Sequence, residues 1–219
     1  MIGIIVFPGS NCEFDVQGAY QELEVEAELV SHRETDLKNY AAVIIPGGFS
    51  YGDYLRAGAI ARFSPVMSAI TSYAESGGHV LGICNGFQVL TEAGLLPGAL
   101  QRNTRLQFLC DEAVVRVEQT RSILTSRMTK GEEFSLPINH FEGNFTADEA
   151  TLADLESHDQ VVLRYVTNPN GSAHDIAGIS NREGNVVGLM PHPERSGLGF
   201  GLSEYAKRLL TPVAASRTL

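Results

Sequence analysis

The stretch HVLGICNGFQVLTEA, residues 79–93, gives the strongest indication of the fold. Val80, Leu81 and Ile83 belong to a short apolar run that is typical of a buried strand. The segment from Asn85 to Ala93 has apolar residues at helical spacing, and it begins directly after the strand. A strand that passes straight into a helix is typical of α/β proteins with a parallel sheet.

The same alternation extends toward the N-terminus. We expect strands over residues 3–7, 27–30 and 41–45, and helices over about 13–24 and 65–75. This order predicts a mostly parallel, doubly wound sheet with helices on both faces. Ligands of such sheets bind beyond the carboxyl ends of the strands. The loops at 8–11 and 46–56 and the turn at Cys84 therefore become candidate site segments.

The second half of the chain has a different pattern. Residues 113–118 (AVVRVE) and 161–166 (VVLRYV) alternate apolar and polar side chains, as half-exposed strands do. Residues 177–179 and 186–189 predict a hairpin, and residues 201–210 predict a closing helix. We see neither internal repeats nor an interdomain linker, so we expect one domain over residues 1–219 with additional antiparallel strands in its C-terminal half.

Composition argues against several classes of function. The net charge of −10 and the lack of a basic stripe disfavour nucleic-acid binding. The N-terminus has no signal-peptide pattern, and no apolar run approaches the ~18 residues of a membrane span. The three cysteines, Cys12, Cys84 and Cys110, are far apart and lack metal-ligand spacing, which predicts reduced thiols, no metal and a cytoplasmic location.

The sequence Gly82-Ile83-Cys84-Asn85-Gly86 has the Gly-x-nucleophile-x-Gly pattern of a nucleophile elbow, with cysteine as the nucleophile. Glycine is required near such a turn because side chains two residues either way collide with neighbouring elements. The start of the following helix favours a thiolate, and the Asn85 N–H faces a developing oxyanion. The alternative is that Cys84 is an inert, small apolar residue at a glycine-rich strand end.

A base for Cys84 is indicated by Met190-Pro191-His192-Pro193-Glu194-Arg195. Pro193 holds His192 extended, so His192 and Glu194 point to the same side. Glu194 then accepts a hydrogen bond from Nδ1 of His192 and leaves Nε2 to face a thiol. Alone, this motif fits a proline-rich surface turn, but with Cys84 it completes a nucleophile, a base and an orienting carboxylate.

The loop Pro46-Gly47-Gly48-Phe49-Ser50 follows an expected strand, where a backbone N–H completes an oxyanion hole. It is not a phosphate-binding loop, because no Gly-Lys-Ser/Thr follows. Cys12 and Cys110 have no evident partner base, so we do not assign a catalytic role to either.

Together, Pro46-Gly47-Gly48, Gly82-x-Cys84-x-Gly86-x-Gln88 and His192-Pro193-Glu194 resemble the class I (triad) glutamine amidotransferases, which have a flavodoxin-like fold. The longer stretches resemble, within that class, the glutaminase subunits of phosphoribosylformylglycinamidine synthase. These stretches run in order from residue 7 to about 195, and they are FPGSNCEFD, PGGFSYGDYLRAGAIAR, GICNGFQVL, NPNGS, IAGISN and GLMPHPER.

The resemblance implies a role for each matching residue. Cys84 attacks the side-chain amide of glutamine, His192 is the general base and acid, and Glu194 orients His192. Backbone N–H groups near Gly48 and Phe49, with that of Asn85, form the oxyanion hole, and Gln88 helps to hold glutamine. One departure is visible at residues 138–144, because many relatives have Ala and Gly where this chain has Asn139 and Phe141, on either side of His140. His140 is therefore expected to line the site or to touch a partner.

The resemblance also implies partners. Ammonia passes to a large synthetase subunit that uses ATP and Mg²⁺ to make the amidine for purine (IMP) biosynthesis, and a small accessory subunit completes the complex. We expect no cofactor in this chain, because it lacks a nucleotide-binding motif.

Two alternatives differ in substrate or in class. The first is the glutaminase of another class I amidotransferase, or a peptidase-like relative. Peptidase-like relatives generally have a histidine directly after the nucleophile, where this chain has Asn85. The second is a non-catalytic regulatory subunit, which predicts decay of the triad.

Overall fold

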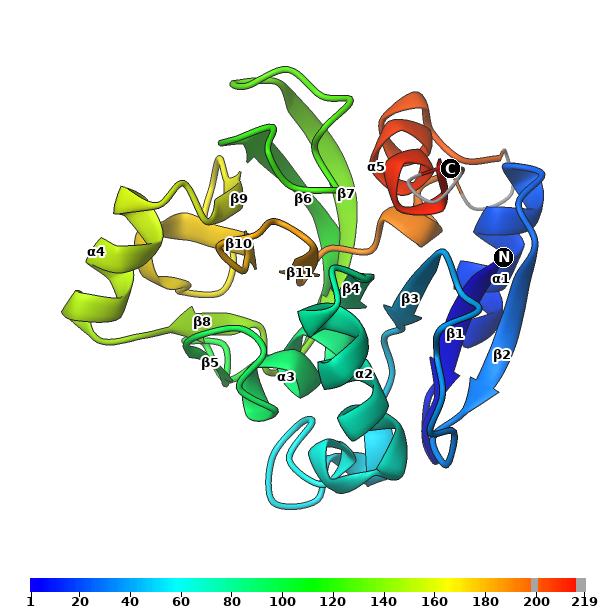
Figure 1. Cartoon of the computed structure of the whole chain (residues 1–219). Helices are drawn as coiled ribbons and strands as arrows, with labels where there is room; N and C mark the ends of the chain where they lie inside the picture. The colour runs from blue at the N-terminus through cyan, green and yellow to red at the C-terminus, as the bar shows by residue number, and fades with distance from the viewer. Residues whose placement is uncertain (198–200, 216–219) are drawn as a thin grey trace.

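The computed structural model describes residues 1–197 and 201–215 of the chain. Within these residues, nine strands form one sheet in the order β2-β1-β3-β4-β11-β10-β9-β6-β7 (Figure 1). A separate antiparallel pair joins β5 (Ala99–Gln101) to β8 (Asn144–Thr146). The strands of the large sheet are β1 (Ile2–Val6), β2 (Ala27–Ser31), β3 (Ala42–Ile45), β4 (His79–Ile83), β6 (Leu109–Val117), β7 (Glu133–His140), β9 (Val161–Tyr165), β10 (Ile176–Ser180) and β11 (Val186–Leu189).

The half of the sheet from β2 to β11 is parallel throughout. All residues of β3 are buried, and β1 and β4 are buried except at one end. Continuous burial is expected where helices cover both faces of a parallel sheet. The strands predicted over residues 3–7, 27–30, 41–45 and 79–83 are confirmed, with bounds that differ by one residue at most.

The helices follow the alternation that the sequence predicts. α1 packs on β1 and β2, whereas α2 and α3 both contact β4. Figure 1 shows these two groups on opposite sides of the parallel strands, which is the doubly wound arrangement. The helices are α1 (Glu13–Glu22), α2 (Pro65–Glu75), α3 (Asn85–Glu92), α4 (Glu149–Ser157) and α5 (Glu204–Ala215).

The other half of the sheet, from β11 through β10, β9 and β6 to β7, is antiparallel. This confirms the expected antiparallel strands and the hairpin of β10 and β11. β6 begins at Leu109 rather than at residue 113, and the closing helix α5 covers residues 204–215 rather than 201–210. No local pattern indicated β7, because Pro137 lies inside it. β7 is the last strand of the sheet, where a missing N–H is tolerated.

The sheet topology brings the expected site segments to one edge. β4 and β11 are parallel neighbours, with Ile83 opposite Leu189, so the elbow after β4 lies beside the segment that leads to His192. β3 pairs with the other side of β4, which places the loop after Ile45 at the same edge. Carboxyl ends of neighbouring parallel strands meet in this way, as the strand order predicts.

Candidate active site

Cys84 occupies a strained turn between β4 and α3. Its backbone has φ 51° and ψ −103°, in the positive-φ region that is uncommon for residues other than glycine. The Cys84 N–H donates to the carbonyl oxygen of Leu189 at 2.8 Å, which ties the turn to β11. Strain of this kind persists only where the surrounding structure enforces it.

The two glycines of the elbow are required by backbone contacts. A Cβ atom on Gly86 would lie 1.9 Å from the carbonyl oxygen of Ile45 in β3. A Cβ atom on Gly82 would lie 2.6 Å from the backbone of Gly86. Backbone cannot move aside as a flexible side chain can, so both positions exclude larger residues. The steric reason that the sequence pattern provides for these glycines agrees with the structure.

His192 and Glu194 form a buried pair close to the elbow. Nδ1 of His192 lies 2.7 Å from Oε1 of Glu194, and the two side chains are 1% and 0% exposed. The His192 N–H donates to the carbonyl oxygen of Pro137 in β7 at 2.8 Å, which fixes the backbone that carries the imidazole. The structure thus has the His-Glu contact that the spacing of these residues predicts.

His192 lines the pocket, and its other imidazole nitrogen is Nε2. Among the described residues, Nε2 of His192 makes no hydrogen bond, although it is buried. Burial disfavours the charged imidazolium, but the Glu194 carboxylate and Cys84 outweigh this effect and raise the pKa of His192 above its usual value. An imidazole with this affinity for a proton is suited to take one from a neighbouring thiol.

Cys84 and His192 line one pocket of about 230 Å³. The pocket receives side chains from loops on the parallel side of the sheet and from the end of β7 and the residues after it. Its lining residues are Asn11, Cys12, Gly48, Phe49, Asp53, Cys84, Gln88, Phe108, Asn139, His140, Phe141, Glu142 and His192. The cavity is therefore a candidate for substrate binding directly at the thiol.

The backbone N–H groups that are expected to form the oxyanion hole differ in whether they already donate a hydrogen bond. The Asn85 N–H belongs to the first turn of α3, where N–H groups have no acceptor within the helix. The Phe49 N–H instead donates to the carbonyl oxygen of Gly9 at 3.0 Å, beside a bridge between Ser10 and Gly48. In this conformation the Phe49 N–H is already engaged, so Phe49 contributes an oxyanion donor only if its peptide reorients.

Gln88 lies in the pocket as expected, but both ends of its amide are engaged. Its Oε1 accepts from Nδ2 of Asn85 at 2.8 Å, and its Nε2 donates to the carbonyl oxygen of Glu142 at 2.5 Å. Gln88 therefore connects the first turn of α3 to the segment after β7. Gln88 lines the pocket, and its expected role in holding glutamine stays a prediction.

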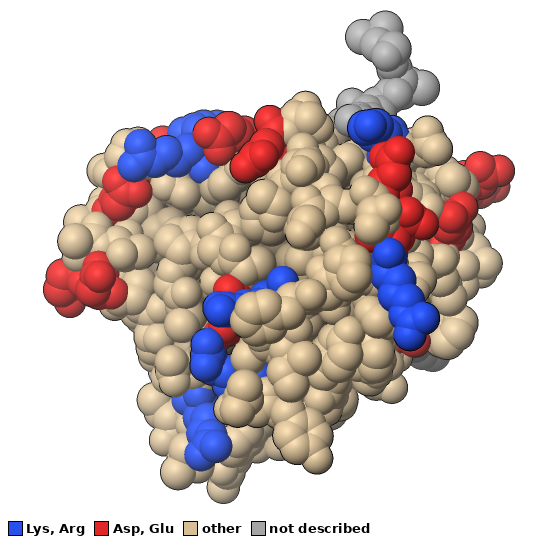
Figure 2. Space-filling model, turned by 60° about the horizontal axis from the view of Figure 1, so that its bottom comes forward, with Lys and Arg blue, Asp and Glu red and all other residues tan. Residues whose placement is uncertain are grey.

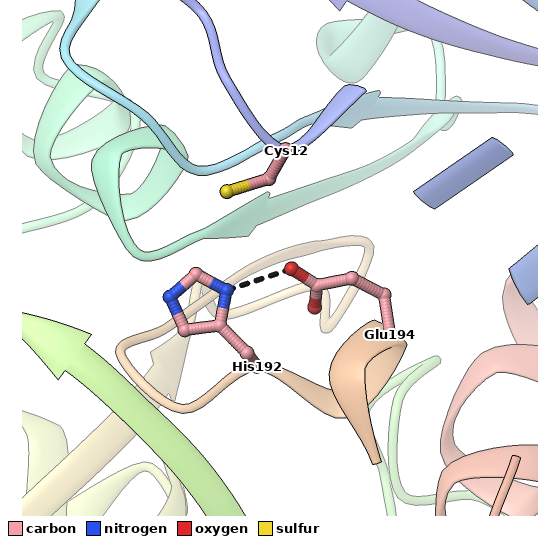
Figure 3. Close-up of side chains that lie close together, drawn as sticks. All are labelled: Cys12, His192 and Glu194. Atoms are coloured by element: carbon pink, nitrogen blue, oxygen red, sulfur yellow. Dashed lines mark hydrogen bonds and ion pairs between the residues drawn. The ribbon is translucent and has the colours of Figure 1, made fainter. Parts of the chain in front are cut away.

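Cys12 also lies at this site, which the sequence did not indicate. Figure 3 shows its sulfur beside His192 and Glu194, and the three ligand atoms lie within 4.8 Å of one another. Burial and the Glu194 charge raise the pKa of Cys12 to about 12, so the thiol stays protonated at neutral pH. Thiol, imidazole and carboxylate are ligands that suit Zn²⁺, but Glu194 and His192 already bond to each other. The expectation that the chain needs no metal stays a prediction.

The wall opposite the elbow consists of residues 139–142. Cys84 donates from its thiol to the carbonyl oxygen of Asn139 at 3.6 Å. His140 was expected either to line the site or to touch a partner. It is 3% exposed and lines the pocket. Burial and His192 lower the pKa of His140 to about 4, so its imidazole is neutral at pH 7. The departures at Asn139 and Phe141 therefore fall in the pocket wall itself.

Two acidic residues of the pocket were not predicted from the sequence. Asp53 belongs to the loop 46–56, which was singled out as a segment without naming this residue. Glu142 lies in the segment 138–144, which the resemblance singled out for His140 without assigning a place to Glu142. A carboxylate in the same loop as the glycines was the only signal for Asp53.

No helix among the described residues is long and apolar enough to cross a membrane.

The chain matches a protein family over nearly all of its length. The family model described as the CobB/CobQ-like glutamine amidotransferase domain matches residues 1–212. Similar curated proteins include phosphoribosylformylglycinamidine synthase subunit PurQ of Lacticaseibacillus paracasei, which is 57% identical over 88% of this chain and 85% of that protein. The protein of the same name in Synechococcus elongatus is 54% identical over 98% of this chain and 99% of its own length.

Solved structures show the same relationship. A chain in the structure of PurLQS from Thermotoga maritima superposes with a TM-score of 0.87 and 40% identity, over 97% of this chain and 96% of that chain. The glutaminase domain of CTPS from Trypanosoma brucei superposes with a TM-score of 0.63 but only 13% identity, over 100% of this chain and 95% of that chain. The second likeness concerns the fold alone.

Proposed function

The chain belongs to the CobB/CobQ-like glutamine amidotransferase family, and from this premise we propose that it is the glutaminase subunit of a phosphoribosylformylglycinamidine synthase. The observation that carries the proposal is the buried His192–Glu194 contact, with His192 and Cys84 lining the same pocket. The relatives named PurQ support the choice of this synthase over other class I amidotransferases.

In the first half-reaction, Cys84 attacks the side-chain amide carbon of glutamine. His192 removes the thiol proton through Nε2, and a carbon–sulfur bond forms as the carbonyl oxygen becomes an oxyanion. The Asn85 N–H stabilises that oxyanion, together with a backbone N–H near Gly48. His192 then gives its proton to the leaving nitrogen, and ammonia departs as the thioester forms.

The second half-reaction restores the enzyme. His192 takes a proton from water, whose oxygen attacks the thioester carbon. The carbon–sulfur bond then breaks to release glutamate, and His192 returns the proton to the departing Cys84 sulfur. Glu194 stays ionised through both steps and holds the imidazole in the correct tautomer and orientation. The raised pKa of His192 follows from this contact and favours proton uptake from Cys84.

The ammonia then serves a larger synthetase subunit, which uses ATP and Mg²⁺ to convert the formylglycinamide ribonucleotide to its amidine. A small third subunit completes the complex. The name of the Thermotoga maritima assembly, PurLQS, supports a complex of this kind. We assign ATP and Mg²⁺ to the partner and no cofactor to this chain. A cytoplasmic location fits the free thiols of Cys12, Cys84 and Cys110.

The synthetase is expected to dock around the mouth of the pocket. Phe49 and Phe108 line the pocket and are still 49% and 48% exposed, and Tyr54 and Leu55 in the adjacent loop are 74% and 89% exposed. Exposed apolar groups of this size are typical of protein–protein contacts. Figure 2 shows the middle of this side of the molecule as mostly uncharged, with a run of basic side chains that descends along its lower left.

Docking also offers a way to activate the site. The Phe49 N–H is bonded to Gly9 in the isolated chain, so a partner that contacts Phe49 can reorient its peptide toward the oxyanion. We therefore expect slow glutamine hydrolysis by the chain alone and faster hydrolysis in the complex.

The test compares two nitrogen sources in the assembled complex. Cys84→Ala should abolish glutamine-dependent amidine formation and leave formation from added ammonium salts near the wild-type rate, because the synthetase site is intact. Loss of both activities would mean that Cys84 acts on folding or assembly. Glutamine-dependent activity above a hundredth of the wild-type value would reject Cys84 as the nucleophile. A regulatory subunit without catalysis predicts no effect of the substitution on either activity.

A further inference from the structure

Two carboxylates face the pocket beside the nucleophile. Asp53 lines it, and its Oδ1 accepts from Nδ2 of Asn85, the residue next to Cys84, at 3.3 Å. Glu142 lines it from the opposite wall, where its Oε2 accepts from the Ala57 N–H at 3.2 Å. Both side chains thus have fixed positions relative to the elbow.

No basic side chain balances these carboxylates inside the pocket. None of the described residues that line it is Lys or Arg. Arg102 pairs with the other oxygen of Glu142 at 3.7 Å, but the Arg102 side chain is 68% exposed and does not line the pocket. Burial and the charge of Glu142 raise the pKa of Asp53 to about 6. A cation bound between these carboxylates would relieve the repulsion between them.

A second feature marks the same pocket as a place for a polar ligand. His140 lines it and is 3% exposed, yet neither of its ring nitrogens has a hydrogen-bond partner among the described residues. Buried polar groups without partners are rare and costly, so the two unpaired nitrogens of His140 indicate a ligand that supplies the missing contacts. Because His140 is neutral, it does not compete with a cation for Asp53.

We propose that Asp53, with the charge of Glu142 facing it across the pocket, binds the α-ammonium group of the substrate glutamine. This inference rests on the proposed function, because it assigns the amide end of glutamine to Cys84. The α-ammonium group lies at the other end of the same small molecule. Asp53 is linked to the nucleophile through Asn85, so the separation between the two subsites is set by the first turn of α3.

The loop that carries Asp53 is built to hold it in place. Tyr51, Gly52 and Asp53 all have positive φ, with 52° at Asp53. The Tyr51 hydroxyl lies 3.1 Å from Nδ1 of His32 and 2.9 Å from Oγ of Ser64, which anchors the loop to two other segments. A carboxylate on an anchored loop binds a cation at a smaller entropic cost than a mobile one.

The subsite gives the enzyme a physical basis for selectivity. Free glutamine carries the ammonium charge, whereas a glutamine residue inside a peptide and the desamino analogue glutaramate do not. A molecule without that charge leaves Asp53 and Glu142 uncompensated at the moment of binding. The enzyme should therefore prefer free glutamine to amides that share its reactive end.

The experiment measures kcat/KM for glutamine and for glutaramate in the assembled complex. Asp53→Asn, which keeps the size of the side chain, should lower the glutamine-to-glutaramate ratio by about 10- to 100-fold, through a higher KM for glutamine. The matched control is Asp36→Asn, at an exposed carboxylate of the loop after β2 that does not line the pocket. This control should keep the wild-type ratio.

A second readout uses the alkylation of Cys84. Asp53→Asn should slow labelling by an amino-acid diazo-ketone that carries an α-ammonium group and leave labelling by iodoacetamide unchanged. An unchanged substrate ratio in a variant with the wild-type unfolding midpoint would overturn the subsite and leave the proposed function standing. A wild-type complex that hydrolyses neither amide would overturn the proposed function, and the subsite with it.

Discussion

The pocket has two sides that are built by different means. The elbow at residues 82–86 belongs to the parallel half of the sheet, and its shape is enforced by contacts between backbone atoms. The wall at residues 139–142 consists of the end of the outermost antiparallel strand and the two residues after it. It is held by side-chain hydrogen bonds such as that from Asn103 to the carbonyl oxygen of His140 at 3.0 Å. The elbow allows almost no change, whereas the wall can change residue by residue.

This difference separates chemistry from recognition. The strained Cys84 and the buried His192–Glu194 pair need fixed geometry, because proton transfer and attack depend on short distances. The wall and the loop that carries Asp53 contribute the groups that distinguish one amide from another. The departures from the family pattern at Asn139 and Phe141 fall on the wall and not on the elbow.

The largest expected effect concerns the base beside the elbow. His192→Ala should lower kcat for glutamine hydrolysis by about 10⁴-fold or more, because it removes the base that takes the Cys84 proton. Glu194→Gln should also lower kcat, but by a factor about 10² smaller than that for His192→Ala, because an orienting group contributes less than the base itself. Steady-state kinetics of the complex, with ammonia-dependent synthesis as the control, measure both losses. A larger loss for Glu194→Gln would reverse the roles.

The next effect tests the rigidity of the elbow against that of the wall. Gly86→Ala places a Cβ against the backbone of Ile45, and Gly143→Ala places one 2.3 Å from Nδ1 of the His140 side chain. We expect Gly86→Ala to lower the free energy of unfolding by about 3 kcal/mol or more. Gly143→Ala should cost less stability and raise KM for glutamine, because the imidazole can shift. Denaturant unfolding measures the stability loss of each variant, and steady-state kinetics measure KM. Equal losses of stability would contradict the view that the elbow is more rigid than the wall.

The sequence predicted the elbow better than the wall, for a physical reason. Gly82, Cys84 and Gly86 lie close together in the chain, and sterics dictate their types, so the pattern is visible locally. The wall depends on the pairing of β6 with β7, which joins residues far apart in sequence and includes Pro137. The engaged state of the Phe49 N–H depends on the bridge between Ser10 and Gly48, which no local pattern encodes.

A smaller effect concerns the pH dependence of substrate binding. Asp53 binds a cation only when it is ionised, and its raised pKa of about 6 means that it is protonated at lower pH. KM for glutamine should therefore rise as pH falls through about 6 and level off above it. The charged group that faces Asp53 is Glu142, with Arg102 on the outer side of Glu142 and the neutral Asn85 beside Asp53. In Asp53→Asn this rise should vanish, and its persistence would assign the pH dependence to another group.

The smallest effect distinguishes the two buried cysteines. Cys12 accepts a hydrogen bond from the Arg195 guanidinium at 3.2 Å, and its raised pKa keeps it a thiol. Cys12→Ala should therefore lower kcat/KM for glutamine by less than about tenfold, the size expected for one lost hydrogen bond. Kinetics of Cys12→Ala beside Cys84→Ala make the comparison, and similar losses for both would show that Cys12 takes part in the chemistry.

The most direct measurement is the mass of the intact protein after treatment with a diazo-ketone analogue of glutamine, followed by peptide mapping. It is made on the chain alone and with the synthetase partner. Our account predicts a single adduct on Cys84 that excess glutamine blocks and that His192→Ala strongly slows. An adduct on Cys12 or Cys110, or no adduct under either condition, would contradict the assignment of Cys84 as the nucleophile of a glutaminase.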